Sequence, residues 1–247
     1  MKKNKNIKKL FKQPVQPYEQ FHNQTKIDKF DEVSLENWPK EWKTIYYKSY
    51  GRFKFIPLVK SSLPTITLEQ VLLDRKSMRD FKKTKAISLE KISNLLFFSS
   101  GQKKDLSSYR FYPSAGARFP LEIYIFPLKS SLEKYIYHYY VKSHGLEQMF
   151  PFDQSDLKEF FFQNFIEDAS LVVVITAIFP RMTNKYGDRG YRYVMNEVGN
   201  LSQNFYLCSV AMELNCCFVG GFIEKHIENL LDIDGINESV VGVLAIG

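Results

Sequence analysis

The apolar positions of this 247-residue chain form helical and strand-like patterns from about residue 65 to the C-terminus. The longest helical pattern runs from Tyr191 to Met212, where apolar side chains recur three or four positions apart. Shorter helices are predicted after the capping residues Thr67 and Ser88, and over 155–165 and 227–231. Strands are predicted over 121–126, 135–141, 171–179, 216–222 and 239–246.

These elements indicate an α+β fold with a central mixed sheet flanked by helices. Hairpins and helices follow one another without strict strand–helix–strand alternation, which is typical of that class. The run 171–179 is continuously apolar and rich in Val and Ile, so we expect a central strand that is buried on both faces. The helix from Tyr191 is longer than most helices and should form the spine of the fold.

The N-terminal part of the chain differs in composition from the rest. Six lysines among the first twelve residues supply +6 of the formal net charge of +7, so the remainder carries about +1 (7 − 6). A basic tail can bind nucleic acid, anionic lipid or an acidic peptide, although a solvated tail is the simpler interpretation. We expect a poorly ordered tail at 1–35, an aromatic arm at 36–64 that packs on the body or on a second subunit, and a body at 65–247.

The composition argues against several classes of protein. No apolar run approaches the roughly 20 residues that cross a bilayer, and no basic stripe with spaced aromatic residues indicates nucleic-acid binding. Cysteines at 208, 216 and 217 suit neither a disulfide framework nor a zinc site, and the scattered histidines form no metal motif. A GxSxG elbow and a P-loop, which would indicate a hydrolase or a kinase, are also missing. Because no apolar signal segment follows the basic N-terminus and the cysteines form no framework, we expect a cytoplasmic protein, and the absent metal motifs predict no metal.

Three segments remain as candidates for chemistry. The first, "DRKSMRDF" at 74–81, groups a hydroxyl with cations: Ser77, Arg75, Lys76 and Arg79. Alternate residues of this segment could converge on one phosphate, although charge alone favours a solvated basic end of a helix.

The other two segments are rich in small residues. In "YPSAGA" the small residues would let the backbone approach a flat ring with its amide groups, or they form a plain loop: Pro113, Ser114, Ala115 and Gly116. In "FVGGF", Gly220 and Gly221 interrupt a strand pattern, which indicates either a backbone laid against a ligand or a β-bulge. Together the three segments would suit a flat ring that carries a phosphate.

Six segments, in this order along the chain, carry a resemblance to a known family. They are "NWPKEWKTIYYKSYGRF", "RKSMRDF", "PSAGARFPLE", "NKYGDRGYRY", "NEVGNLSQNFYL" and "VGGF", and they span most of the chain. The sequence resembles the nitroreductase superfamily of flavin enzymes, in the branch of the streptolysin-type azoline dehydrogenases that mature thiazole- and oxazole-containing peptides. The resemblance implies flavin mononucleotide (FMN) bound between the two subunits of a homodimer, with the long helix at the centre of the interface.

The resemblance also implies roles for the three segments. The phosphate and ribityl chain of FMN would be held by Arg75, Ser77 and Arg79, with Lys76 as a further cation. The isoalloxazine ring of FMN would be faced, from the partner subunit, by Pro113, Ser114, Ala115 and Gly116. The backbone that addresses the flavin N5 region would be Gly220 and Gly221.

Two departures from the family pattern bear on these roles. Relatives usually continue beyond the last strand and carry a basic residue there that helps to hold the phosphate, whereas this chain ends at Gly247. The cations of segment 74–81 must then suffice, or the flavin binds more loosely. Asn200 also stands where many close relatives have His.

The reaction implied by the resemblance needs a base. An azoline becomes an azole by losing a hydride, which the flavin N5 accepts, and a proton. A Lys-Tyr pair within "NKYGDRGYRY" is the signature of the azoline dehydrogenases, so Lys185 is the expected base and Tyr186 the residue that orients the ring heteroatom. Lysine serves as a base only if its pKa falls towards neutrality, which an apolar site can cause. Without the resemblance, an ordinary surface pair would be the preferred interpretation.

Two other functions stay open. One is an FMN-dependent reductase of dehydroamino acids in a modified peptide, which the Lys-Tyr pair disfavours. The other is a non-catalytic subunit that binds flavin or peptide within a maturation complex, which the intact cofactor segments disfavour. The expected partners are a peptide substrate, a second copy of the chain and a cyclodehydratase of the same pathway, with no nucleic acid and no membrane span.

Overall fold

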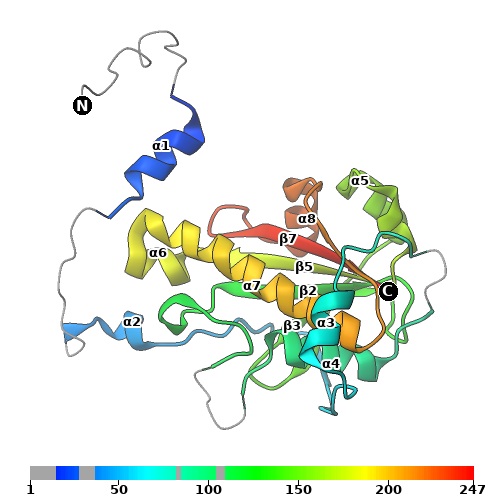
Figure 1. Cartoon of the computed structure of the whole chain (residues 1–247). Helices are drawn as coiled ribbons and strands as arrows, with labels where there is room; N and C mark the ends of the chain where they lie inside the picture. Colours follow the sequence, from blue (N-terminus) through cyan, green and yellow to red (C-terminus); the bar gives the residue numbers. More distant parts are fainter. Residues whose placement is uncertain (1–14, 28–36, 82–84, 104–108) are drawn as a thin grey trace, which may run out of the picture. The chain divides into compact units, whose positions relative to one another are not determined.

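The computed structural model describes residues 15–27, 37–81, 85–103 and 109–247, in two compact units, Met1–Trp38 and Pro39–Gly247 (Figure 1). In the first unit, α1 (Pro17–Gln24) starts with a proline and a capping box between Gln16 and Glu19. This helix lies within the stretch that we expected to be poorly ordered, while the six lysines of the basic tail lie outside the described residues.

The second unit is built on a seven-stranded sheet with the order β1-β4-β3-β2-β5-β7-β6. Its strands are β1 (Lys54–Pro57), β2 (Leu121–Pro127), β3 (Tyr135–Tyr140), β4 (Gly145–Pro151), β5 (Leu171–Ile178), β6 (Cys216–Val219) and β7 (Glu238–Ile246). Every pairing between strands of the described residues is antiparallel, whereas we expected a mixed sheet. The strands β5 and β6 run in the same direction, but β7 inserts between them with the opposite direction and prevents a parallel pair.

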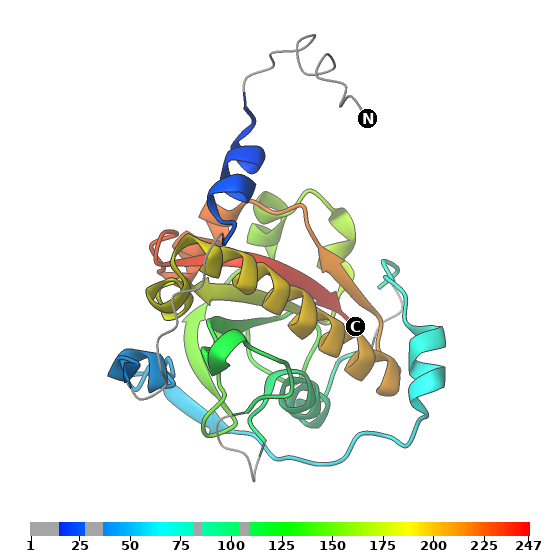
Figure 2. The ribbon, with the colours of Figure 1, turned by 60° about the vertical axis from the view of Figure 1, so that its left-hand side comes forward.

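Each face of the sheet carries its own apolar core. On one face, strand residues such as Ile123 and Val173 pack against α4 (Leu89–Ser100) and the long α7 (Gly190–Ala211), which runs over the sheet in Figures 1 and 2. On the other face, their neighbours in the strands pack against α5 (Leu157–Phe160) and α8 (Glu224–Leu231). The central strand β5 is buried along nearly its whole length, as its apolar run predicted.

Local capping rules explain the ends of the shorter helices. The helix α3 (Leu68–Asp74) starts at Thr67, whose Oγ1 accepts a hydrogen bond from the backbone N–H of Gln70 at 3.1 Å. The helix α4 starts at Ser88, whose Oγ accepts from the backbone N–H of Lys91 at 3.2 Å. Both starts, and the long α7, confirm the sequence prediction. No helix among the described residues combines the length and apolar character needed to cross a membrane.

The helix predicted over 155–165 was wrong. A 3-10 turn and the single turn of α5 are followed by extended backbone at Phe161, which forms a β-bridge with Phe222. The next N–H, of Phe162, donates to the carbonyl of Gly221 at 3.2 Å. Pairing with a distant segment therefore takes the hydrogen bonds that a helix would have used. The glycines 220–221 themselves follow β6 and do not lie within it.

The aromatic arm packs on the body of its own chain. The buried guanidinium of Arg118 donates to the backbone oxygens of Glu41, Trp42 and Thr44 at 2.6–2.7 Å, which holds the short helix α2 (Lys40–Lys43). Further along, Lys48 pairs with the carboxylate of Glu238 at 2.5 Å, and β1 adds to the sheet beside β4. Residues 39–64 thus belong to the same compact unit as the body.

Candidate active site

The helix that carries the Lys-Tyr pair is α6 (Pro180–Tyr186), which our sequence analysis did not predict although Pro180 occupies a favourable first position. Buried Arg181 anchors it, donating to the Glu122 carboxylate at 2.6 Å and to the carbonyl of Phe119 at 3.1 Å. Glu122 in turn bonds His138 at 3.0 Å. Although burial alone would raise the pKa of Glu122, His138 and Arg181 lower it to about 2, so the carboxylate is charged and holds α6 on the sheet.

The loop 113–117 packs directly against the Lys-Tyr pair. Gly116 has a left-handed backbone conformation with φ +60°, and a Cβ at this position would overlap the hydroxyl of Tyr186. The same Cβ would lie 3.1 Å from Nζ of Lys185. Close approach by these two side chains of the same chain therefore explains why residue 116 has no side chain of its own.

A buried glutamate on α7 supports this loop from beneath. Glu197 is only 2% exposed, and its Oε1 accepts from Oγ of Ser114 at 2.9 Å and from the backbone N–H of Ala115 at 3.0 Å. Its Oε2 is buried and has no hydrogen-bond partner among the residues the structure describes. Burial raises the pKa of Glu197 to about 7, against the opposing effect of its two donors.

Sequence reasoning missed Glu197, yet the sequence contains a signal for it. The residue follows Val194 by three positions and precedes Leu201 by four, so it lies on the apolar face of the long helix. An acid on that face must be buried and needs a partner, which makes it a candidate for a role at the site.

Two aromatic rings lie beside the half-buried Lys185. Its Nζ lies 5.7 Å from the ring centre of Trp42 and 5.4 Å from that of Tyr186, while Tyr193 packs edge-on against Tyr186 at 5.0 Å. The indole N–H of Trp42 donates to the carbonyl of Asn184 at 3.2 Å, so the arm forms one wall of this region.

These surroundings shift the pKa values of both side chains of the pair. Burial, with help from the charge of Arg118, lowers the pKa of Lys185. Burial also raises the pKa of Tyr186, with smaller contributions from Tyr193 and Glu197. The lysine is thus shifted towards its neutral, basic form and the tyrosine is kept as a hydroxyl that can donate a hydrogen bond.

The predicted phosphate ligands lie at a second place, which we call the cradle: residues 75–79 together with Tyr206 of α7. The hydroxyls of Ser77 and Tyr206 are 2.9 Å apart, and the guanidinium of Arg75 lies over the Tyr206 ring at 5.4 Å. Tyr206 also accepts from the backbone N–H of Phe218 in β6 at 2.7 Å, and the N–H of Met78 donates to the carbonyl of Cys216 at 3.0 Å. The cradle is therefore tied to both α7 and β6.

The residues of the cradle fit an anionic group. Within the described part of the chain, no carboxylate lies within 4 Å of the nitrogens of Arg75, Lys76 or Arg79. Just beyond β6, Gly220 is exposed, and a Cβ there would meet no heavy atom within 4 Å. Gly221 is more confined, since a Cβ there would come within 2.6 Å of the Gln163 side chain. Cations, a hydroxyl and accessible backbone are the groups that a flavin phosphate and ring would need.

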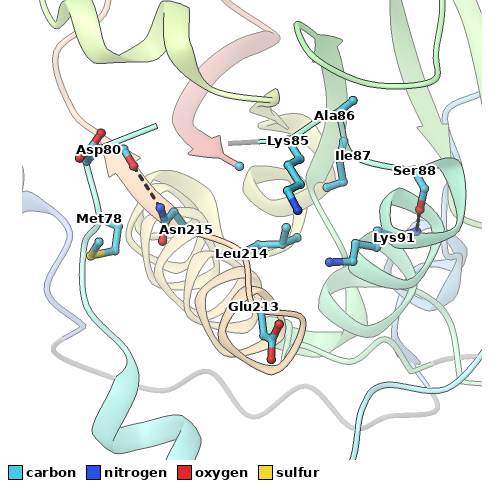
Figure 3. A pocket seen from close by; sticks show the side chains of 11 residues that line it. Met78, Asp80, Lys85, Ala86, Ile87, Ser88, Lys91, Glu213, Leu214 and Asn215 are labelled. Atoms are coloured by element: carbon cyan, nitrogen blue, oxygen red, sulfur yellow. Dashed lines mark hydrogen bonds between the residues drawn. The ribbon is translucent and has the colours of Figure 1, made fainter. Parts of the chain in front are cut away.

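Open space adjoins the cradle. A cavity of about 680 Å³ lies between Met78 and Asp80 on one side and the start of α4 on the other, with Lys85 and Lys91 pointing into it (Figure 3). The side chain of Asn215 donates to the carbonyl of Asp80 at 3.0 Å along its rim. A second cavity of about 330 Å³ is lined by Lys76 and Tyr206 of the cradle itself. Neither cavity is lined by Lys185 or Tyr186.

The predicted site residues thus form two groups along α7. Glu197 supports the first, which contains the loop 113–117 and the Lys-Tyr pair, and Tyr206 supports the second, the cradle, beside Gly220. Tyr206 follows Glu197 by nine positions along the helix, which corresponds to a rise of about 14 Å. One helix, α7, thus supports both the amine and hydroxyl of the Lys-Tyr pair, through the loop 113–117, and the cationic cradle.

Comparison with known proteins identifies the class. Residues 72–247 match the model of the Nitroreductase family. The chain belongs to this family and is a nitroreductase-family flavin oxidoreductase, which confirms the superfamily and the nitroreductase-like α+β fold predicted from the sequence.

Two curated relatives are similar in sequence. The chain is 35% identical over 173 residues to "Putative nitroreductase MJ1384" of Methanocaldococcus jannaschii, a match that covers 68% of this chain and 85% of that protein. It is 26% identical over 156 residues to the microcin B17-processing protein McbC of Escherichia coli, where the match covers 60% of this chain and 57% of McbC.

Two solved structures share the fold. The E. coli microcin synthetase McbBCD complex with truncated pro-MccB17 bound contains a chain with a TM-score of 0.64 and 21% identity, covering 93% of this chain and 91% of that one. A nitroreductase-type protein from Desulfovibrio desulfuricans in complex with FMN has a TM-score of 0.50 and 15% identity, covering 74% and 87%.

Proposed function

We propose that this protein is an FMN-dependent azoline dehydrogenase, which converts thiazoline and oxazoline rings of a ribosomally made peptide to thiazoles and oxazoles. The observation that carries the proposal is the Lys-Tyr pair: burial lowers the pKa of Lys185, and both side chains lie on the loop 113–117. The similarity to a microcin B17-processing protein, and to a chain of the McbBCD complex, supports a role in peptide maturation.

In the proposed reaction, bound FMN supplies the hydride acceptor. Neutral Lys185 takes the proton from the azoline carbon, so the ring loses one hydride and one proton and becomes aromatic. The hydroxyl of Tyr186 donates a hydrogen bond to the ring heteroatom and orients the ring. Trp42 lies beside Lys185 and Tyr193 packs on Tyr186, and the partial burial of Lys185 favours its neutral, basic form. The electrons then pass to an external acceptor, most simply oxygen.

The cradle would bind the cofactor. Its cations Arg75, Lys76 and Arg79 would hold the phosphate together with Ser77, because no carboxylate among the described residues neutralises them. The backbone at Gly220 and Gly221 would face the ring near N5, and Pro113, Ser114, Ala115 and Gly116 would face it from the partner subunit.

The proposed arrangement includes a homodimer. The loop 113–117 and the cradle are supported by different parts of α7, and a second copy of the chain would bring one of each to a shared cofactor. On α7, the exposed residues Asn196, Gly199, Asn200 and Gln203 recur with helical spacing and would lie at the centre of that interface. A cyclodehydratase of the same pathway would deliver the peptide.

A single-turnover experiment tests the proposal. Protein reconstituted with FMN is mixed without oxygen with a peptide that carries azoline rings, and the absorbance of the oxidised flavin is followed. We expect the flavin colour to bleach with wild type and to persist with Lys185→Ala, although both bind FMN. The control Lys142→Ala removes an exposed lysine that also lies over an aromatic ring, and it should bleach like wild type.

The opposite result would favour the reductase. In that case azoline peptide leaves the flavin oxidised, while chemically reduced flavin is reoxidised by a peptide that carries dehydroalanine. A protein that binds no FMN under any condition would instead refute every flavin-dependent function.

A further inference from the structure

The loop 113–117 is held in a costly conformation. Besides Gly116, two residues that carry side chains have positive φ angles: Ala117 in the loop, at 52°, and Phe119 just after it, at 45°. Such conformations persist only where neighbouring contacts impose them. The contacts here converge on one carboxylate: Ser114 accepts from the backbone N–H of Phe119 at 2.8 Å and itself donates to Glu197.

The Lys-Tyr pair rests on that loop. The hydroxyl of Tyr186 and Nζ of Lys185 are the nearest atoms to the position that a Cβ of Gly116 would occupy. A change in the hydrogen bonds of Glu197 would therefore move the surface on which both groups lie.

The charged and titratable groups around Glu197 come from two segments packed against α7. Arg110 and Tyr112 precede the loop, Tyr186 comes from α6, and Glu197 belongs to α7. Arg110 favours the ionised carboxylate, but its guanidinium bonds the hydroxyl of Tyr112 at 3.3 Å, and its Nη2 has no hydrogen-bond partner in the described part of the chain. Burial prevails over Arg110 and leaves the pKa of Glu197 at about 7, so the carboxyl changes charge close to neutral pH.

We propose that Glu197 is a positioning residue, which acts through the loop 113–117 to place the Tyr186 hydroxyl and the Lys185 amine, with a strength that depends on its own charge. An ionised carboxylate accepts hydrogen bonds more strongly than a neutral one. Ionisation therefore tightens the loop, and protonation loosens it. The catalytic consequence rests on the proposed function, whereas the structural one does not.

Amide hydrogen exchange tests the structural part without any reaction. Exchange at Ala115, corrected for the intrinsic effect of pH, is measured from pH 6 to 8.5 in wild type and in variants of Glu197. Wild type should gain protection as pH rises through about 7. Glu197→Gln, whose amide oxygen is a neutral acceptor at every pH, should keep the lower protection of protonated wild type and show no step. Glu197→Ala should exchange about tenfold faster, because Ala115 loses its acceptor. The control Glu159→Gln changes an exposed glutamate and should behave like wild type.

The pH profile of azoline oxidation tests the catalytic part. In wild type, kcat should show an inflection near pH 7 that disappears in Glu197→Gln, and a merely structural carboxylate would leave the profile unchanged. If Glu197→Ala does not fold, Glu197→Asp takes its place, since the shorter side chain should also expose Ala115.

Two results would overturn the inference: equal exchange at Ala115 in all variants, or the same kcat profile in Glu197→Gln as in wild type. If wild type oxidises no azoline, the proposed function fails, while the exchange data still decide whether Glu197 holds the loop.

Discussion

Replacing Gly116 with alanine should uncouple the Lys-Tyr pair from its support while the fold survives. An L-residue in the left-handed conformation at φ +60° costs about 1–2 kcal/mol relative to glycine. The new methyl group would also overlap the Tyr186 hydroxyl and press on Lys185, and both side chains are flexible enough to move away. The free energy of unfolding should therefore fall by about 1–2 kcal/mol, which lowers Tm by about 2–8 °C for a chain of this size.

The effect on catalysis should be much larger than the effect on stability. Misplacing a reacting group by about 1 Å can cost about 10²-fold in rate. We therefore expect kcat for azoline oxidation to fall by about 10²-fold in Gly116→Ala, measured by mass spectrometry of the product peptide under saturating FMN. Thermal unfolding of the same preparation measures the stability.

A matched variant separates strain from displacement. Gly235 has a similar backbone conformation, φ +69°, and the three atoms nearest to a Cβ there belong to the carboxylate of Glu228. Gly235→Ala should lower Tm to a similar extent and leave kcat within about twofold of wild type, because the strain alone is shared. The reasoning is refuted if Gly116→Ala keeps the wild-type kcat, or if both variants lose activity equally.

Three further predictions concern the cofactor, the buried acid and the assembly. Arg79→Glu should release FMN at least tenfold more readily than wild type in a fluorescence titration, because it puts a negative charge beside the phosphate, and unchanged retention would remove Arg79 from the cradle. Folding raises the pKa of Glu197 from its ordinary 4.5 to about 7, so the unfolded chain loses this proton at lower pH than the folded chain. The free energy of unfolding therefore falls by ~3 kcal/mol in all as pH rises from 4.5 to 7. Glu197→Gln should therefore gain stability over wild type as pH rises from 4.5 to 7, which urea unfolding across pH measures; a constant difference would contradict this. Light scattering should find a homodimer that holds FMN, and a monomer that retains flavin would contradict the shared site.

Local chemistry explains which elements the sequence could predict. Thr67 and Ser88 start helices because each side chain satisfies a backbone N–H within three residues, and no distant contact is needed. The apolar spacing from Tyr191 similarly defines α7. The predicted helix over 155–165 failed because Phe161 and Phe162 pair with residues about 60 positions away, which no local pattern reveals.

In the candidate site, too, some features are visible in the local sequence and others depend on distant contacts. The cations of the cradle and the small residues of the loop are visible in the sequence, and the family resemblance added the Lys-Tyr pair. That Gly116 lies against Tyr186, some 70 residues later, depends on how Arg181 anchors α6 to β2. Glu197 was missed because it was hidden in an apolar pattern, where only its charge distinguishes it.

The most direct test of the central claim is the mass change of a cyclised peptide incubated with FMN-loaded protein. The account predicts a loss of two hydrogens per azoline ring with wild type. Lys185→Ala should stay yellow but lose about 10²- to 10⁴-fold in rate, since it lacks the general base, and Tyr186→Phe should also fall steeply. A gain of two hydrogens on a dehydroalanine peptide, seen only with added reductant and unaffected by Lys185→Ala, would contradict the account and identify a reductase instead.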